Sequence, residues 1–145
     1  MKKIKVLLLT FALILLAGCG KSLTNKSTGD TMKISLDVDT SSNYVWSYSI
    51  MDSNVIDLKS EEFLTPADDE TLDCDAQVLT FKAFNEGESE IILSYMNNDS
   101  GKTKYDITYV ITVDANKNIK VKEKSGKYSK KLPNPVIYTE SNDEK

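Results

Sequence analysis

The stretch Tyr105–Val113 reads YDITYVITV, and its odd-numbered positions are all apolar. A period of two places successive side chains on opposite faces of a strand, so this run predicts a β-strand with one buried face. It is the longest such run, and shorter runs of the same kind lie on both sides of it. The expected strands are 32–38, 44–50, 55–59, 79–83, 91–95, 105–113 and 119–121.

This series of short strands indicates the fold class. No helical pattern of comparable length interrupts it, and its regular spacing predicts an all-β, immunoglobulin-like antiparallel β-sandwich. The strands 79–83 and 91–95 flank the turn sequence Asn85–Glu88, so we expect them to form a hairpin. Residues 61–76 form the longest gap between strands and are expected to be an acidic loop.

The composition excludes several functions. The 145 residues include 18 lysines but no arginine and no histidine. The chain therefore has no Ser-His or Cys-His catalytic pair and no His-ligated zinc site. No other acid, base and nucleophile are grouped as catalysis requires, so we expect no enzyme activity and no cofactor. The acids of residues 68–75 match no calcium-loop spacing, so we expect a solvated loop and no metal site. A formal charge of -4 without arginine argues against nucleic-acid binding.

The N-terminus has the pattern of an export signal. Three lysines precede the apolar run Val6–Ala17, which is too short to span a hydrocarbon core of ~30 Å. The sequence Leu16-Ala17-Gly18-Cys19 resembles the lipobox of bacterial lipoproteins, in which the cysteine is acylated and becomes the first residue. This resemblance implies lipidation of Cys19 and an extracytoplasmic chain anchored by lipid to the bacterial cell membrane. The alternatives are an ordinary signal peptide and an uncleaved anchor. Cleavage before Cys19 would leave 127 residues with a formal charge of -7, because three lysines are lost.

These patterns divide the chain into four parts. We expect a signal peptide over 1–18, a flexible tether over 19–31, the β-sandwich domain over 32–123, and a mobile tail over 124–145 that is lysine-rich and then acidic. Within the tail, Val136–Tyr138 is a candidate edge strand. The lysines of 117–131 either protect a sheet edge from aggregation or attract an anionic surface. A monomer is expected.

Several stretches together resemble the chagasin family of peptidase inhibitors. They are 44–50, 52–58, 60–63 and 80–87, and the runs 91–95 and 105–114 continue the match in the same order. The resemblance covers about residues 33–114. It implies an immunoglobulin-like sandwich that inhibits papain-like cysteine peptidases by inserting three loops from one end into the active-site cleft.

The three loops differ from the pattern usual in that family. The first loop usually reads Asn-Pro-Thr-Thr-Gly and is DTSSN over 39–43 here, where Asn43 can still replace glycine at positive φ because asparagine tolerates that region. The second usually carries Gly-x-Gly-Gly and is LDCD over 72–75. The third usually reads Arg-Pro-Trp and is NND over 97–99, so the arginine and the aromatic anchor are missing. The candidate inhibitory-loop residues are Thr40, Ser41, Ser42, Asn43, Asp73, Cys74, Asp75, Asn97, Asn98 and Asp99.

Two functions are consistent with a matching scaffold and changed loops. In the first, the chain is a membrane-anchored inhibitor of papain-like cysteine peptidases. In the second, it is a non-inhibitory cell-surface binding module that kept the scaffold and lost the inhibitory loops. Cys74 lies between two acids, which raise the pKa of a thiol, so we expect an unreactive loop cysteine, with an intermolecular disulfide as the alternative.

Overall fold

The computed structural model describes residues 28–140, so the predicted signal peptide, Cys19 and most of the predicted tether lie outside the described residues. Within 28–140 there is no helix, and hence no helical segment that could span a membrane. The strands are β1 (Thr31–Asp37), β2 (Tyr44–Ile50), β3 (Ile56–Leu64), β4 (Ala76–Ala83), β5 (Gly87–Asn97), β6 (Thr103–Val113), β7 (Ile119–Lys127) and β8 (Val136–Tyr138).

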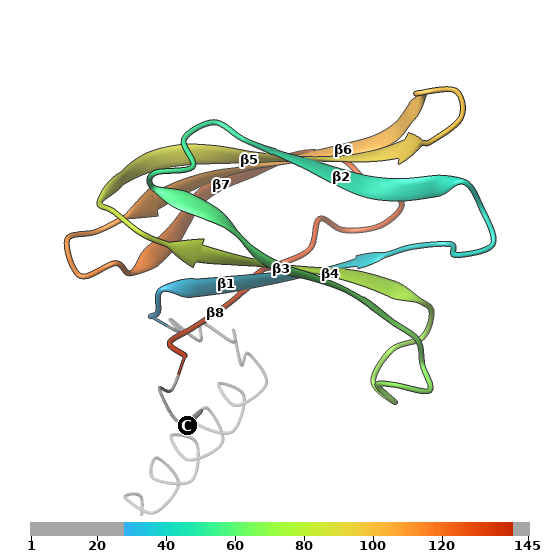
Figure 1. Ribbon diagram of the computed structural model, residues 1–145, viewed down its shortest axis with the longest axis horizontal. Helices are drawn as coiled ribbons and strands as arrows, with labels where there is room; N and C mark the ends of the chain where they lie inside the picture. Colours follow the sequence, from blue (N-terminus) through green and yellow to red (C-terminus); the bar gives the residue numbers. More distant parts are fainter. Residues whose placement is uncertain (1–27, 141–145) are drawn as a thin grey trace, which may run out of the picture.

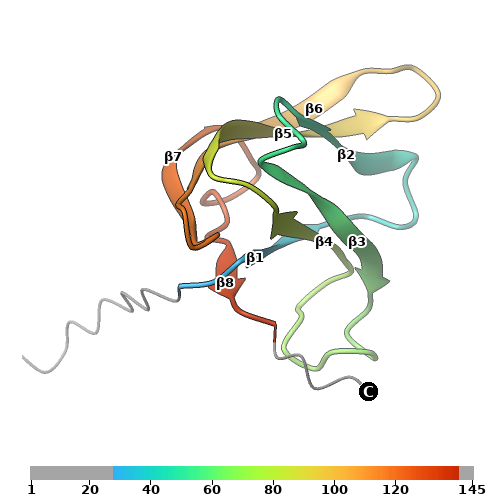
Figure 2. The same ribbon diagram turned by 60° about the vertical axis from the view of Figure 1, so that its left-hand side comes forward.

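The strands form two sheets of four that stack face to face (Figures 1 and 2). One sheet has the order β3-β4-β1-β8 and the other the order β2-β5-β6-β7. Every neighbouring pair is antiparallel. This architecture confirms the predicted all-β sandwich.

The core lies between the two sheets and follows the predicted alternation. In β6, Ile107, Tyr109 and Ile111 are fully buried, while the residues between them are only partly buried. The opposite sheet contributes Met32, Ile34 and Leu36 from β1, with Leu79 and Phe81 from β4. Apolar burial of this kind holds the sheets together and makes the sandwich a rigid support for its loops.

The predicted hairpin between 79–83 and 91–95 is wrong. β4 lies between β1 and β3 in one sheet, whereas β5 lies between β2 and β6 in the other. The turn at Asn85–Glu86 therefore carries the chain from one sheet to the other. Alternation identifies a strand and its buried face, but it does not identify the strand's partner.

Both ends of the sandwich extend beyond the expected limits of 32 and 123. Residues expected in the tether belong to the fold, because the Ile119 N–H donates to the Gly29 carbonyl at 2.8 Å and Lys82 pairs with Asp30 at 2.8 Å. Within the expected tail, β7 runs to Lys127 and β8 pairs with β1 over Thr31–Lys33. Residues 28–31 and much of 124–140 are therefore structural parts of the domain.

Candidate functional site

Three loops meet at the end of the sandwich where β1 ends and β2 begins (Figure 1, right-hand side). We call them together the loop tip, which comprises residues 38–43, 65–75 and 98–102. Backbone hydrogen bonds join the first loop to the other two: the Val38 N–H donates to the Asp75 carbonyl at 3.0 Å, and the Asn98 N–H donates to the Asn43 carbonyl at 2.9 Å.

Side chains join the same loops a second time. The Thr40 hydroxyl donates to the Asp75 carboxylate, and the Asn43 amide donates to the Asp99 carboxylate. The structure thus brings Thr40, Asn43, Asp75 and Asp99, all predicted loop residues, into one bonded group. The first loop lies between the other two and connects them.

The first loop is a closed turn organised by Asp39. Its carboxylate accepts hydrogen bonds from the Ser41 N–H at 3.0 Å and the Ser41 hydroxyl at 2.5 Å. The Ser42 N–H and hydroxyl both donate to the Asp39 carbonyl. Because the bonds from Ser41 favour the charged form, they hold the pKa of Asp39 below its ordinary value. Asn43 does not adopt the positive φ that asparagine tolerates, since Lys117 is the one non-glycine residue of 28–140 with positive φ.

The third loop is equally compact. The Asn97 side-chain oxygen accepts hydrogen bonds from the backbone N–H groups of Asp99 and Ser100, at 3.0 and 2.9 Å. The Gly101 N–H donates to the Asn97 carbonyl at 2.8 Å, and Gly101 has φ +68°, a conformation that favours glycine. Asn97 itself ends β5, so it orients the loop, while Asn98 and Asp99 are exposed on it.

The second loop is longer and is held by two local turns. The Asp68 carboxylate accepts from the N–H and the hydroxyl of Thr65, both at 2.8 Å. The Asp69 carboxylate accepts from the N–H and the hydroxyl of Thr71, at 2.9 and 2.7 Å. These bonds lower the pKa of both aspartates. The two carboxylates shape the loop, and residues 28–140 contain no cluster of three or more His, Cys, Asp or Glu arranged to hold a metal ion.

Aromatic side chains support the first loop from below. The indole N–H of Trp46 donates to the Asp37 carbonyl at 2.9 Å, and the Asp37 N–H donates to the Tyr128 hydroxyl oxygen at 3.0 Å. The Asp39 N–H donates to the Tyr95 hydroxyl oxygen at 3.1 Å. The Trp46 ring packs against both tyrosine rings, with centroids 5.0 Å from Tyr95 and 5.7 Å from Tyr128. Backbone groups on both sides of Val38 are thereby fixed to the core.

Gln77 connects the two sheets just behind the tip. Its side chain belongs to β4 and is fully buried, yet it pairs with the backbone of β2 in the other sheet. The Gln77 amide oxygen accepts the Trp46 N–H at 2.9 Å, and the Gln77 amide nitrogen donates to the Trp46 carbonyl at 2.8 Å and to the Glu61 carboxylate at 2.5 Å. The Gln77 side chain thus takes the place of a neighbouring strand at the free edge of β2.

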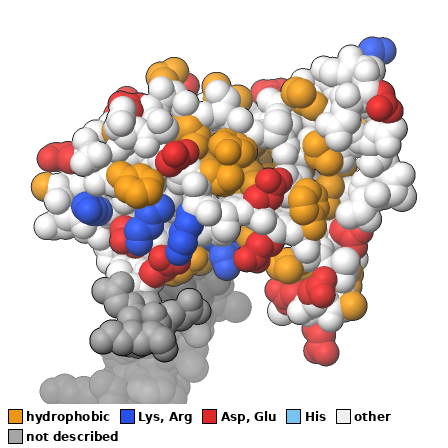
Figure 3. Space-filling view, in the orientation of Figure 1, with side chains coloured by type: hydrophobic (Ala, Val, Ile, Leu, Met, Phe, Trp, Pro, Cys, Tyr) orange, Lys and Arg blue, Asp and Glu red, His pale blue; other side chains and the backbone are white. Residues whose placement is uncertain are grey.

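The surface of the tip is acidic and has no aromatic side chain. Its three loops contain seven Asp and Glu residues and one lysine, Lys102. Red side chains gather on the lobe at the lower right of Figure 3, over the β3–β4 loop. Asp73 and Asp99 are exposed. The tip therefore favours a partner surface of opposite charge.

Cys74 is an exposed thiol in the second loop. Partial desolvation and the negative charge of Asp37 raise the pKa of Cys74 above its ordinary value, so the thiol is protonated at neutral pH. The predicted direction is confirmed, although Asp37 contributes more than the flanking Asp73. A protonated thiol is a poor nucleophile, so Cys74 is not activated for nucleophilic attack.

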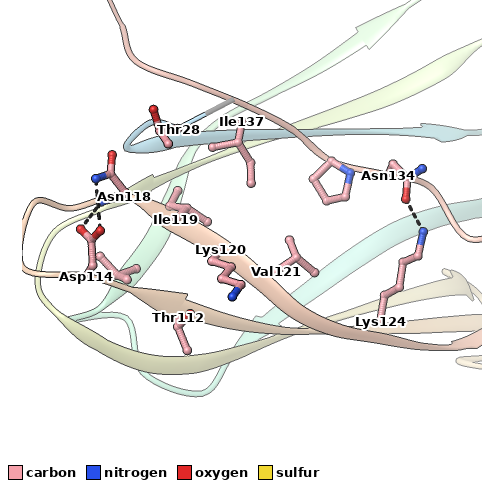
Figure 4. Close-up of a pocket in the computed structure, with 12 residues that line it drawn as sticks. Thr28, Thr112, Asp114, Asn118, Ile119, Lys120, Val121, Lys124, Asn134 and Ile137 are labelled. Atoms are coloured by element: carbon pink, nitrogen blue, oxygen red, sulfur yellow. Dashed lines mark hydrogen bonds between the residues drawn. The ribbon is translucent and has the colours of Figure 1, made fainter. Parts of the chain in front are cut away.

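A groove of about 830 Å³ lies away from the tip, between β7 and the segment that precedes β8. Ile119, Val121 and Ile137 point into it, and Lys124–Asn134 and Asp114–Asn118 hydrogen bonds lie at its two ends (Figure 4). Its lining includes none of the predicted loop residues. The groove and the loop tip are thus separate features.

Comparison with known proteins identifies the family. The sequence profile of chagasin family peptidase inhibitor I42 matches residues 25–113, which is more than half of the chain. The chain belongs to the chagasin family of peptidase inhibitors. This family consists of inhibitors and not of enzymes, and the resemblance drawn from residues 33–114 is confirmed.

A solved structure has the same fold as the chagasin-like domain. The chain is similar to the crystal structure of the cysteine protease inhibitor EhICP2 from Entamoeba histolytica, with 20% sequence identity and a TM-score of 0.50. The match covers 61% of this chain and 81% of the other. A search of curated protein sequences found no significant match.

Sequence reasoning missed two residues that shape the tip. Tyr128 lies in the expected mobile tail, where isolated apolar residues give no periodic signal. Gln77 lies in the run Ala76–Ala83, in which all residues except Lys82 are buried. The signal in the sequence is a glutamine that precedes the apolar pair Val78-Leu79, where a buried side chain would need hydrogen-bond partners.

Proposed function

We propose that the chain is a membrane-anchored inhibitor of papain-like cysteine peptidases and that the loop tip occupies the active-site cleft of its target. The observation that carries the proposal is the bonded convergence of the three candidate loops, on a chain that belongs to an inhibitor family. An inhibitor of this kind needs a rigid set of loops and no catalytic group. Because the tip is already ordered by its own hydrogen bonds, little conformational entropy is lost on binding.

The charge of the tip defines the kind of peptidase that it fits. Seven acids against one lysine would be repelled by an acidic cleft and attracted by a basic one. We therefore expect a target whose cleft has lysine or arginine along its rim. The missing arginine and aromatic anchor of the third loop would be replaced by contacts of Asp73, Asp75 and Asp99 with that rim.

The anchor is proposed from the sequence Leu16-Ala17-Gly18-Cys19. β1 begins at Thr31 and reaches the tip only at Asp37, so the chain enters the domain at the end opposite the tip. A lipid on Cys19 would hold the domain at the extracytoplasmic membrane surface with its tip free. The test is to express the chain in bacteria grown with a labelled fatty acid. The label is expected on the wild-type chain and is expected to be absent from the Cys19→Ser variant.

The second candidate function is a cell-surface binding module without inhibitory activity. The observation that favours it is the absence of aromatic and arginine side chains from the loop tip, since these residue types usually dominate interface energies. In this case the same tip would bind a basic partner other than a peptidase.

Inhibition assays distinguish the two functions. The chain from residue 19 onward, carrying Cys19→Ser to prevent acylation, is titrated into papain-like peptidases with acidic and basic cleft rims, and substrate hydrolysis is followed. The proposal expects inhibition at or below micromolar concentration, strongest for basic rims and weakened by added salt. No inhibition of any peptidase at micromolar concentration would favour the binding module.

Charge reversals locate the contact. Asp73→Lys changes an exposed tip residue, whereas Glu86→Lys makes the same change at the exposed turn between β4 and β5, at the far end of the sandwich. Asp73→Lys is expected to weaken inhibition several-fold at low salt, mainly by slowing association, and Glu86→Lys to leave it nearly unchanged. Equal effects of the two variants would place the contact elsewhere.

A further inference from the structure

The segment between β7 and β8 passes beside the loop tip. It begins at Tyr128 and lies beyond residues 25–113, which match the family profile. The segment crosses from the sheet of β7 to the sheet of β1 (Figure 1). The Tyr109 hydroxyl donates to the Pro133 carbonyl at 2.9 Å, and Leu132 packs against the core, so the crossing is fixed in place.

Asp37, the last residue of β1, is the point where this segment contacts the root of the first loop. β8 pairs with β1 only over Thr31–Lys33, so it does not reach Asp37. Asp37 pairs with Ala76 of β4 on one side, and on its other side side chains take the place of a strand partner. The Asp37 N–H donates to the Tyr128 hydroxyl oxygen at 3.0 Å, and the Lys130 ammonium lies 2.7 Å from the Asp37 carboxylate.

The position of Asp37 determines that of two loops. The next residue, Val38, begins the first loop and donates its N–H to the Asp75 carbonyl of the second loop. A displacement of Asp37 would therefore move both loops. The Lys130 and Asp37 side chains are 61% and 41% exposed, so their ion pair adds little to overall stability and acts mainly on local geometry.

We infer that residues 128–130 form a clamp that holds Asp37, and that Tyr128 and Lys130 are positioning residues for the loop tip. The inference rests on the proposed function only in assigning an inhibitory role to the loops that are held. Such a clamp adds a fourth segment to the three loops and acts on them through Asp37. Residues 128–130 lie outside residues 25–113, which match the family profile, and the clamp gives them a role.

Point variants test the clamp, because deletion of the segment would also remove β8 and Leu132 from the fold. Tyr128→Phe keeps the ring and removes the hydroxyl that accepts the Asp37 N–H. Tyr138→Phe, in the strand β8 that follows the segment, is the matched control, since no hydrogen bond joins its hydroxyl to another residue of 28–140. Lys130→Met and Lys131→Met form a second matched pair, because Lys131 makes no ion pair within 28–140.

The measurements are amide hydrogen exchange by NMR and the inhibition constant, both on the chain from residue 19 onward with Cys19→Ser. Tyr128→Phe is expected to speed exchange at Asp37 by about tenfold or more, with smaller increases over 39–43 and no change at central amides of β6. The inhibition constant is expected to rise about threefold or more for Tyr128→Phe and less for Lys130→Met, while both controls match wild type.

Two results would overturn the clamp: unchanged exchange at Asp37 in Tyr128→Phe, or faster exchange with an unchanged inhibition constant. If the wild-type chain inhibits no peptidase, the proposed function has failed separately. The clamp is then decided by exchange at Asp37 and over 39–43 alone, where rates equal to those of Tyr138→Phe would refute it.

Discussion

Replacing Gln77 by leucine tests whether one buried side chain holds the two sheets together behind the tip. Leucine has a similar volume and suits a fully buried site, but it cannot pair with the Trp46 N–H and carbonyl that Gln77 binds at 2.9 and 2.8 Å. Each buried backbone group left without a partner is destabilising by about 1–3 kcal/mol. For two such groups we expect Gln77→Leu to lower the free energy of unfolding by about 3 kcal/mol, within a range of about 2–6 kcal/mol.

Urea unfolding followed by the fluorescence of Trp46, the single tryptophan, measures this change directly. With the ordinary urea dependence of about 1–3 kcal/mol per M, a loss of about 3 kcal/mol lowers the midpoint by about 1–3 M urea. Glu61→Gln is the control, because it alters only the partly exposed third bond of Gln77 and is expected to change stability by less than about 1 kcal/mol. Equal stabilities of the two variants, within about 0.5 kcal/mol, would show that the bonds of Gln77 to Trp46 do not stabilise the fold.

Three further predictions concern titration and close packing. Burial raises the pKa of Tyr109 above its ordinary value of 10.0. The protonated Tyr109 side chain therefore contributes fully to stability below about pH 10, and this contribution is lost as the pH rises further. Urea titrations between about pH 9 and about pH 11 should show a smaller loss of stability in Tyr109→Phe than in wild type. In Gly29→Ala the new Cβ would lie 2.0 Å from the Tyr138 carbonyl, so we expect a loss of about 1–3 kcal/mol and faster amide exchange in β8, and an unchanged β8 would contradict the packing. Hydrogen bonds from Ser41 lower the pKa of Asp39 below 3.8, so their contribution to stability is present above pH 3.8 and is lost as the pH falls through the lowered pKa. In Ser41→Ala, NMR titration should find an Asp39 pKa closer to 3.8. An Asp39 pKa equal to that of wild type would contradict these hydrogen bonds.

The strands themselves were largely predictable from sequence. The alternation around Trp46 predicts 44–50, and β2 has these bounds. The error at β4 and β5 arises because a period of two describes one strand at a time, while pairing depends on the whole sheet. The connection at Asn85–Glu86 has the composition of a hairpin turn but joins two sheets.

The candidate site was predictable in its members but not in its support. The positions of the three loops follow from the strand order of the family, and their residues from counting along the chain. The bonds that support the tip from behind come from Gln77, Tyr95 and Tyr128, whose backbone partners Trp46, Asp39 and Asp37 are distant from them in sequence. Tyr128 follows the lysine-rich end of β7, where no hydrophobic period signals that the next residues return to the core.

In the proposed function, the loop tip occupies a peptidase's active-site cleft. The most direct test of this occupation is the steady-state kinetics of a papain-like peptidase with a basic cleft rim, measured at several concentrations of the chain from residue 19 onward with Cys19→Ser. Occupation of the cleft predicts competitive inhibition, in which the apparent KM rises with inhibitor and kcat is unchanged. A fall in kcat with constant KM, or no inhibition at micromolar concentration, would contradict the claim.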